Sequence, residues 1–289
     1  MDDKPLAPGL YLVATPIGNL EDITLRALRV LRQADRIACE DTRQTQKLLH
    51  HFGIERPTVS YHMHNEVGRS EELVAQLQAG ARIAVVSDAG TPGIADPGAP
   101  LVAAAIAAGV AVYPIPGANA VLAALIASGL SAETFTFHGF LPSKAGQRRS
   151  ALEALPRDHA THIFYESPHR ILESLADVAA VFSAAQPIVL ARELTKLHEE
   201  FLRGTVAEVQ QTLSARAELA GHLRGEMVLL FASSALAEAS ASTEQSVAAA
   251  VRALMAGEGL SEKDALKRIA RERGIGKSDA YRELQRGRR

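Results

Sequence analysis

Four turns rich in glycine, proline and small residues each follow a short apolar run. They read ATPIGNLEDIT (14–24), SDAGTPGIADPG (87–98), PIPGANA (114–120) and FYESPHR (164–170). Glycine permits positive φ and close approach to the backbone, whereas proline fixes φ and stiffens a loop. Turns of this kind expose backbone N–H and C=O groups with few bulky side chains, so the chemistry they favour is ligand binding through the backbone.

The segments between these turns predict the elements that must position them. We predict strands at 10–14, 36–40, 58–62, 82–87 and 110–115, then at 135–140, 162–167, 188–193, 199–204 and 226–231. Helical patterns cover 24–34, 42–52, 71–80, 99–109, 145–155, 168–182 and 205–217. This alternation predicts an α/β fold with a mostly parallel sheet covered on both faces, and the closely spaced last strands predict an antiparallel portion in a second sheet. The turns then lie at carboxyl edges of sheets, where open α/β sheets bind ligands.

The pattern divides the chain into three parts. We predict an N-terminal α/β domain over 1–118, a second α/β domain over 119–232 and a small all-α module over 245–289. Small and polar residues at 232–247 are typical of a linker. In the C-terminal module Ser261 and Asp264 predict a helix start. The apolar seam expected there consists of Leu266, Ile269, Ala270, Ile275, Tyr281 and Leu284, in a weak helix-turn-helix pattern without identifiable base-reading residues.

Composition excludes several classes of protein. The 289 residues are 47% hydrophobic and contain one cysteine, Cys39, so no intramolecular disulfide can form. The N-terminus lacks a signal-peptide pattern, and no apolar run is long enough to span a bilayer. We therefore expect a cytoplasmic protein without membrane contact.

Charge is distributed unevenly along the chain. Residues 261–289 hold ten Lys and Arg against five Asp and Glu, whereas the other 260 residues hold 21 against 28. A basic end on an acidic body suggests contact with a polyanion. The alternative is a solvated helical end that binds nothing.

The motifs together resemble a known family. LVATPIGNLEDIT, SDAGTPGIADPG, PGANA, FYESPHR and ARELTKLHEEFLRGT, in this order over about residues 9–232, resemble the tetrapyrrole-methylase superfamily of S-adenosylmethionine enzymes, and within it the 16S ribosomal RNA cytidine 2′-O-methyltransferases. The resemblance implies two α/β domains with the cofactor between them and no metal. It also implies a homodimer acting on 16S rRNA in the small ribosomal subunit.

The resemblance also implies the cofactor-binding residues. They are Thr15, Pro16 and Gly18 of the first turn, Asp88, Gly90, Thr91, Ile94 and Ala95 of the second, Asn119 and Ala120 of the third, and Tyr165 and Met227 of the second domain. Family members that act on small molecules have Gly-Asp-Pro where this chain has Gly90, Thr91 and Pro92, so the contact made by Asp88 stays open. Pro16, Gly90 and Gly93 are alternatively plain turn formers, Asp88 a turn cap, and Tyr165 a core aromatic.

Methyl transfer to a ribose hydroxyl needs in-line alignment and a proton acceptor. Polar runs at 39–45, 61–66 and 191–200 contain the candidates. For catalysis they are Glu40, Asp41, Arg43, Glu193 and Lys196. The candidates for RNA phosphates are Arg43 and Lys196 of these runs, Arg170 of the fourth turn, and Lys267, Arg268, Arg271 and Lys277 of the basic end. Arg192, Glu193 and Lys196 are alternatively surface ion pairs. His62 and His64 have the alternation of a metal pair on a strand, but without a third ligand we favour a substrate-facing role.

Two other functions remain open at this stage. A methylase of small porphyrin-like rings would share the cofactor cleft but would not need a basic tail. A non-catalytic RNA-binding module would use the tail but leave the four turns unexplained. With five Tyr, eight Phe and no Trp, stacking of bases on a sheet surface is an improbable mode of RNA recognition, and contacts with phosphates and shape are favoured.

Overall fold

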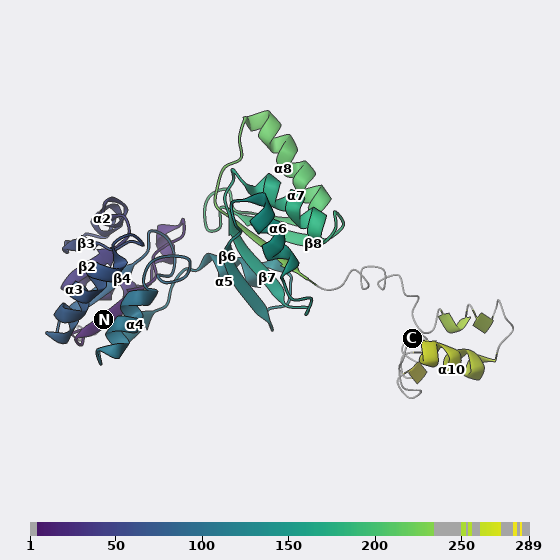
Figure 1. Cartoon of the computed structure of the whole chain (residues 1–289), viewed down its shortest axis with the longest axis horizontal. Helices are drawn as coiled ribbons and strands as arrows, with labels where there is room; N and C mark the ends of the chain where they lie inside the picture. The colour runs from purple at the N-terminus through teal and green to yellow at the C-terminus, as the bar shows by residue number, and fades with distance from the viewer. Residues whose placement is uncertain are drawn as a thin grey trace. The chain divides into compact units, whose positions relative to one another are not determined.

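The computed structural model describes residues 5–233, 250–252, 254–255, 261–272, 280–281 and 284. The chain falls into two compact units, residues 1–233 and 234–289 (Figure 1). The larger unit contains two five-stranded sheets. Over the described ranges, no helix has both the length and the apolar character needed to cross a membrane.

The first sheet is entirely parallel. Its strands are β1 (Gly9–Val13), β2 (Arg36–Cys39), β3 (Thr58–Ser60), β4 (Arg82–Val86) and β5 (Val112–Ile115), in the order β3-β2-β4-β1-β5. The helices between them are α1 (Leu25–Gln33), α2 (Thr42–His51), α3 (Glu66–Gln78) and α4 (Ala99–Ala107), and a short 3₁₀ turn spans Leu20–Asp22. This order places β1 and β4 side by side at the centre, so the turns that follow them meet at one edge.

The core of this sheet has two faces because successive side chains of a strand point to opposite sides. On β1, Tyr11 and Val13 pack with α1 residues, whereas Leu10 packs with residues of α3 and α4. Strands buried on both faces read as continuous apolar runs, as RIAVV of β4 does. The predicted parallel sheet covered on both faces is confirmed.

The second sheet is mixed. Its strands are β6 (Phe135–Phe140), β7 (Thr161–Glu166), β8 (Pro187–Arg192), β9 (Glu200–Thr205) and β10 (Met227–Ala232), in the order β6-β7-β10-β8-β9. Only the β6–β7 pair is parallel, and the other three pairs are antiparallel. The helices α6 (Ala145–Glu153), α7 (Ile171–Val181) and α8 (Val206–Ala220) pack on one face, and α5 (Ala120–Ser128) packs on the other. The predicted antiparallel portion is confirmed.

Some element boundaries differ from the prediction. Helix α3 begins at Glu66, five residues before the predicted start, and α7 begins at Ile171 instead of 168. Helix α5 was not predicted, since its apolar residues lack a marked amphipathic period; Asn119 caps its start and Gly129 ends it with φ 84°. The domain boundary at 118/119 stays a prediction.

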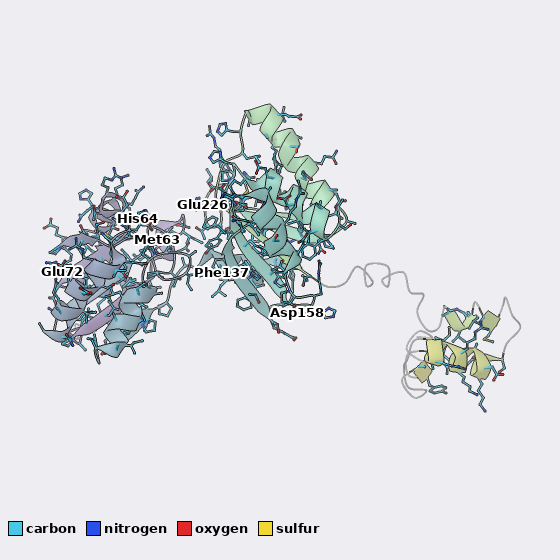
Figure 2. The ribbon with its side chains drawn as sticks, in the orientation of Figure 1. Met63, His64, Glu72, Phe137, Asp158 and Glu226 are labelled. Carbon is cyan, nitrogen blue, oxygen red and sulfur yellow. The ribbon has the colours of Figure 1, made fainter. Side chains whose placement is uncertain are left out.

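The strand predicted over 58–62 is two residues too long. Strand β3 ends at Ser60, because the Asn65 side chain accepts a hydrogen bond from the backbone N–H of His62 (2.9 Å) and donates one to the carbonyl oxygen of Ser60 (3.3 Å). His62 and His64 therefore lie beyond the end of the strand, with ring centroids 5.9 Å apart. Figure 2 labels His64 beside Met63 in the turn that follows. The expectation that His62 and His64 share one face of a strand is wrong.

The smaller unit has a helix, α10 (Glu262–Glu272), whose start is capped as predicted, since Ser261 Oγ accepts a hydrogen bond from the N–H of Asp264 (3.2 Å). Its core contains Val251, Ala265, Ile269 and Leu284. Tyr281, expected in the apolar seam, is 54% exposed, which corrects that prediction. Lys267, Arg268 and Arg271 are exposed on α10, whereas Ile275 and Lys277 lie outside the described residues.

Candidate functional site

The turns after β1 and β4 are joined by backbone hydrogen bonds. The N–H of Thr15 donates to the oxygen of Gly90 (2.8 Å), and the N–H of Gly90 donates to the oxygen of Thr15 (3.1 Å). Ser87 Oγ donates to the same Gly90 oxygen (3.0 Å), and Thr15 Oγ1 donates to the carbonyl of Ser87 (3.1 Å). Gly90 has φ +89°, and an added Cβ would lie 3.2 Å from Ile17 Cγ2. The positive φ therefore favours glycine here, and a side chain would also crowd Ile17.

The turn after β5 is tied to the same place. Asn119 Oδ1 accepts a hydrogen bond from the N–H of Leu122 (3.1 Å) and so caps α5, while its Nδ2 donates to Thr91 Oγ1 (3.2 Å). Thr91 Oγ1 in turn donates to the carbonyl of Ala118 (3.2 Å). Three strand-end turns therefore form one hydrogen-bonded rim, which holds their backbones in fixed positions.

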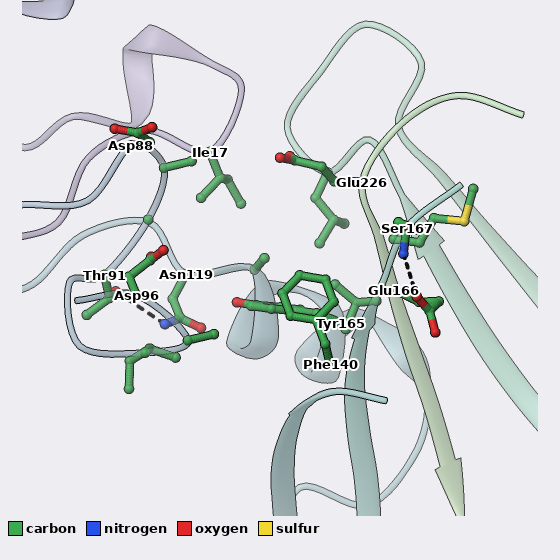
Figure 3. A pocket seen from close by; sticks show the side chains of 18 of the residues that line it. Ile17, Asp88, Thr91, Asp96, Asn119, Phe140, Tyr165, Glu166, Ser167 and Glu226 are labelled. Atoms are coloured by element: carbon green, nitrogen blue, oxygen red, sulfur yellow. Dashed lines mark hydrogen bonds between the residues drawn. The ribbon is translucent and has the colours of Figure 1, made fainter. Parts of the chain in front are cut away.

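This rim forms one wall of a cavity of about 340 Å³, which we call the acidic pocket. Nine of the twelve predicted cofactor residues line it: Asp88, Gly90, Thr91, Ile94, Ala95, Asn119, Ala120, Tyr165 and Met227. In Figure 3, Asp88, Asp96 and Asn119 lie on the side of the first sheet and face Tyr165 and Glu226 from the second. The turns on which these residues lie do meet, while their binding roles stay predictions.

Three carboxyl groups, Asp88, Asp96 and Glu226, line the acidic pocket. Glu166 also belongs to the lining, but its side chain is fully buried and its carboxylate is held by Ser167 and Ser174. The described lining contains no Lys, Arg or His. Burial raises the pKa of Asp96 to about 6, and the nearby carboxylates of Glu40, Asp88 and Glu226 add to the shift. Such an environment favours a cationic ligand, because a positive charge would be attracted by the carboxylates and would offset the repulsion between them. The sequence analysis missed Asp96, although it stands in the same turn as Gly90.

Tyr165 supplies a flat wall. Burial raises the pKa of Tyr165 to about 12, so its hydroxyl stays protonated. Its ring makes edge contacts with Phe137 and Phe140, at centroid distances of 4.8 and 5.6 Å. Tyr165 thus packs with its neighbours and also borders the pocket, and the two roles proposed for it are compatible.

Glu166 and Arg170 are held inside the fold. Glu166 is buried, and its carboxylate accepts hydrogen bonds from the N–H of Ser167 (2.8 Å) and the hydroxyl of Ser174 (2.6 Å). The Arg170 guanidinium lies 3.5 Å from Glu166 and donates to the carbonyl oxygens of Leu141 and Pro142. Arg170 therefore has intramolecular partners where an RNA phosphate was predicted.

The remaining predicted cofactor residues, Thr15, Pro16 and Gly18, line a neighbouring cavity of about 640 Å³. Its lining also contains Lys47, His51 and Lys196, and we call it the basic pocket. It shares Ile17, Asp88, Ala89 and Glu226 with the acidic pocket. The first turn therefore faces a second space beside the one where the other nine residues meet.

The Lys196 side chain extends from the second half of this unit to Gly18 of the first turn. Its Nζ donates to Glu193 (2.9 Å) and lies 3.3 Å from the Glu226 carboxylate, while its stem covers Gly18, where an added Cβ would lie 2.3 Å from Lys196 Cγ. The hydrogen bond from Lys196 lowers the pKa of Glu193. Burial acts to lower the pKa of Lys196, but its hydrogen bonds and the two carboxylates raise it overall, so the ammonium group stays charged.

The turn that holds Lys196 has an unusual backbone. Glu193 and Thr195 have φ of 49° and 67°, values that favour glycine. Gly225, with φ +93°, lies against Glu193, and a Cβ there would come within 2.5 Å of Glu193 Cγ. Strained positions of this kind concentrate at functional sites, which agrees with the choice of Glu193 and Lys196 as candidates.

Glu40, Asp41 and Arg43 lie at the end of β2, outside the described lining of both pockets. The Asp41 carboxylate caps α2 by accepting from the N–H of Arg43 (2.8 Å) and also pairs with the Arg43 guanidinium (2.8 Å), which together lower the pKa of Asp41 to about 2. The N–H of Asp41 donates to Asp88 Oδ1 (3.1 Å). The backbone of Asp41 thus holds Asp88 in place, and the Arg43 side chain is paired with Asp41.

No metal centre is evident in the part of the chain that the structure describes, where no three His, Cys, Asp or Glu side chains are grouped to hold an ion.

Comparison with known proteins agrees with this fold. The chain belongs to the tetrapyrrole (corrin/porphyrin) methylase family, whose model matches residues 9–210, a family of S-adenosylmethionine-dependent methyltransferases. Two relatives bear the name ribosomal RNA small subunit methyltransferase I. One from Synechocystis sp. is 46% identical over 94% of this chain and 95% of its own length, and one from Halalkalibacterium halodurans is 48% identical over 97% and 94%.

A solved structure supports the fold. Uroporphyrin-III C-methyltransferase from Thermus thermophilus, complexed with S-adenosylhomocysteine, matches with a TM-score of 0.52 and 17% identity, covering 77% of this chain and 97% of that one. At this identity the match concerns the arrangement of the two sheets.

Proposed function

We propose that this protein transfers a methyl group from S-adenosylmethionine to the ribose 2′-hydroxyl of a cytidine in the decoding region of 16S rRNA, within the small ribosomal subunit. The acidic pocket carries the proposal, because the carboxyl groups of Asp88, Asp96 and Glu226 and the lack of basic lining residues suit a cofactor with a sulfonium and an ammonium group. The names of the full-length relatives support ribosomal RNA as the substrate.

The residues of the pocket fit such a cofactor. Gly90 leaves the backbone of the second turn open to close approach, and Tyr165 offers a ring face beside which an adenine can lie. Asp88 and Asp96 place negative charge where the cofactor carries positive charge. Asn119, held by Thr91 and by the N-terminus of α5, fixes the third side of the pocket.

Bound S-adenosylmethionine supplies an electrophilic methyl carbon on a positively charged sulfur. The protein then has to align the ribose oxygen with that carbon and accept the hydroxyl proton. Asp88 lines both pockets, so its carboxylate can face a ribose at their boundary, with Lys196 beside it to hold negative charge. Asp41 and Glu193 have lowered pKa values, which makes them weak proton acceptors.

Capture of the particle involves the C-terminal unit. Lys267, Arg268 and Arg271 are exposed on α10 and would contact RNA phosphates. Lys277 is proposed to act with them. Recognition by phosphate contacts and shape agrees with the low content of aromatic residues.

The proposal includes a homodimer in the cytoplasm. Leu122 and Ile126 of α5 are 50% and 80% exposed, and Phe135 and Phe140 of β6 are 41% and 55% exposed. Apolar side chains of this size at the surface favour contact with another protein surface. Light scattering should report twice the mass of one chain. The substitution Ile126→Asp should shift the measured mass toward that of a single chain.

The experiment that tests the function is mass spectrometry of 16S rRNA from cells with and without the gene, combined with transfer of labelled methyl groups to purified small subunits. We expect one cytidine ribose to lose its methyl group in the deletion strain. A 2′-deoxy target should bind but yield no product. A methylated ribose that persists without any redundant enzyme, or transfer to a tetrapyrrole alone, contradicts the proposal.

A further inference from the structure

We infer that the basic pocket is a nucleotide subsite, in which Lys47 and His51 of α2 hold the phosphate next to the target ribose. The inference rests on the proposed function, since it takes the substrate to be RNA, and it names a place for that substrate. None of the residue assignments made above includes Lys47 or His51.

One face of α2 is turned into the basic pocket. Gln44, Lys47, Leu48 and His51 follow the i, i+3, i+4, i+7 spacing of a single helical face, and all four line the cavity. Thr45 also lines it but is buried, at 4% exposure. A polar face that borders a cavity of about 640 Å³ has room for a nucleotide.

Lys47 and His51 of α2 are available to a ligand. Lys47 Nζ donates to the uncharged Gln44 side chain (3.2 Å), and in the described part of the chain neither Lys47 nor His51 forms an ion pair with a carboxylate. Lys196, on the facing wall, is by contrast balanced by Glu193 and Glu226. The anion-binding capacity of the pocket therefore lies on the side of α2.

The boundary between the pockets matches the geometry of the reaction. Ile17, Asp88, Ala89 and Glu226 line both cavities, so a ribose at this boundary has the acidic pocket on one side and the basic pocket on the other. Its 2′-hydroxyl would face the methyl donor, and its phosphate would extend toward Lys47 and His51. The described lining of the acidic pocket has no Lys, Arg or His to hold a phosphate, whereas that of the basic pocket has Lys47 and His51, which favours this orientation.

The test uses the full-length protein with Lys47→Gln and His51→Gln combined, and His50→Gln as the matched control. His50 is exposed on the same helix but does not line either pocket. We expect the double variant to raise KM for small ribosomal subunits about tenfold, whereas the calorimetric Kd for S-adenosylmethionine changes less than twofold. Binding of small subunits, measured with S-adenosylhomocysteine present, should show a salt slope smaller by about 0.7 for one lost phosphate contact.

Each outcome bears on the inference. Unchanged KM and salt slope in the double variant would overturn it while the proposed function stands. A parallel rise in the Kd for S-adenosylmethionine would also overturn it, since the residues would then act on the acidic pocket. Wild-type protein that methylates no RNA would instead overturn the proposed function, and that result appears before any variant is measured. If His50→Gln had the same effect as the double variant, α2 would act only through general surface charge, and the subsite would be rejected.

Discussion

The acidic and basic pockets share four lining residues yet differ in charge and in construction. Backbone turns build much of the acidic pocket, and hydrogen bonds among Thr15, Ser87, Gly90, Thr91 and Asn119 hold their positions. The basic pocket is lined by exposed side chains of α2 and by Lys196, whose stem lies over Gly18.

The difference shows how one sheet edge can serve two ligands. A rigid wall of backbone suits a cofactor of constant shape, because little conformational entropy is lost on binding. Long side chains on a helix suit a phosphate, whose attraction to a charge depends weakly on direction. The predictions below test whether the two pockets act separately.

The largest effect is expected from Gly90→Val. A β-branched side chain at φ +89° would strain the backbone and press on Ile17, so the Kd for S-adenosylmethionine should rise at least about tenfold, or about 1.4 kcal/mol. Calorimetry measures this. Gly68→Val is the control, because a Cβ there meets nothing within 4 Å. Wild-type affinity in folded Gly90→Val protein would reject the rim as a cofactor wall.

The affinity for S-adenosylmethionine, measured over a pH series, should reveal the titration of Asp96. Its pKa is raised to about 6 in the free protein, so the carboxylate is protonated below that pH and ionised above it, and a cationic ligand binds the ionised form. Affinity for S-adenosylmethionine should therefore rise up to about tenfold from pH 5 to pH 7.5, with protons released on binding near pH 6. Asp96→Asn should flatten the profile. A profile of the same steepness in Asp96→Asn would assign the titration to another group.

Gly18→Ala should disturb mainly the basic pocket. The added methyl group would displace the Lys196 stem and weaken its bonds to Glu193 and Glu226, without backbone strain at residue 18. We expect KM for small subunits to rise about fivefold, close to 1 kcal/mol, with a smaller change in cofactor affinity because Glu226 lines both pockets. Combination with Lys196→Ala should add little, because both changes remove the same contacts. Full additivity would mean that Gly18 acts independently of Lys196.

Removal of residues 245–289 should have the smallest effect on either pocket. All described lining residues of the two pockets lie between residues 15 and 228, so the Kd for S-adenosylmethionine should stay within about twofold. Loss of phosphate contacts by Lys267, Arg268 and Arg271 should reduce the salt slope of RNA binding by about 0.7–0.9 for each contact. An unchanged slope would mean that the basic helices are only a solvated end of the chain and do not contact RNA.

Much of the fold was predictable because it follows from local patterns. Apolar runs of four to six residues, separated by helical periods and glycine-rich turns, indicate parallel strands buried on both faces. All ten predicted strands are present, and the turns at 87–98 and 114–120 do meet at one edge. Helix α5 escaped prediction because an apolar surface all round gives no amphipathic signal.

What the sequence by itself determined is therefore the alternation of elements and the places where the backbone must turn sharply, since glycine and proline act through their own φ angles. Only the tertiary structure decided which side chains share a space. The order β3-β2-β4-β1-β5 joins Thr15 to Gly90, 75 residues away, and packing alone sets Asp96 among other carboxylates and Lys196 over Gly18. Such charges and contacts depend on residues distant in the chain, and for that reason Lys47 and His51 read as an ordinary helix surface until the basic pocket was seen.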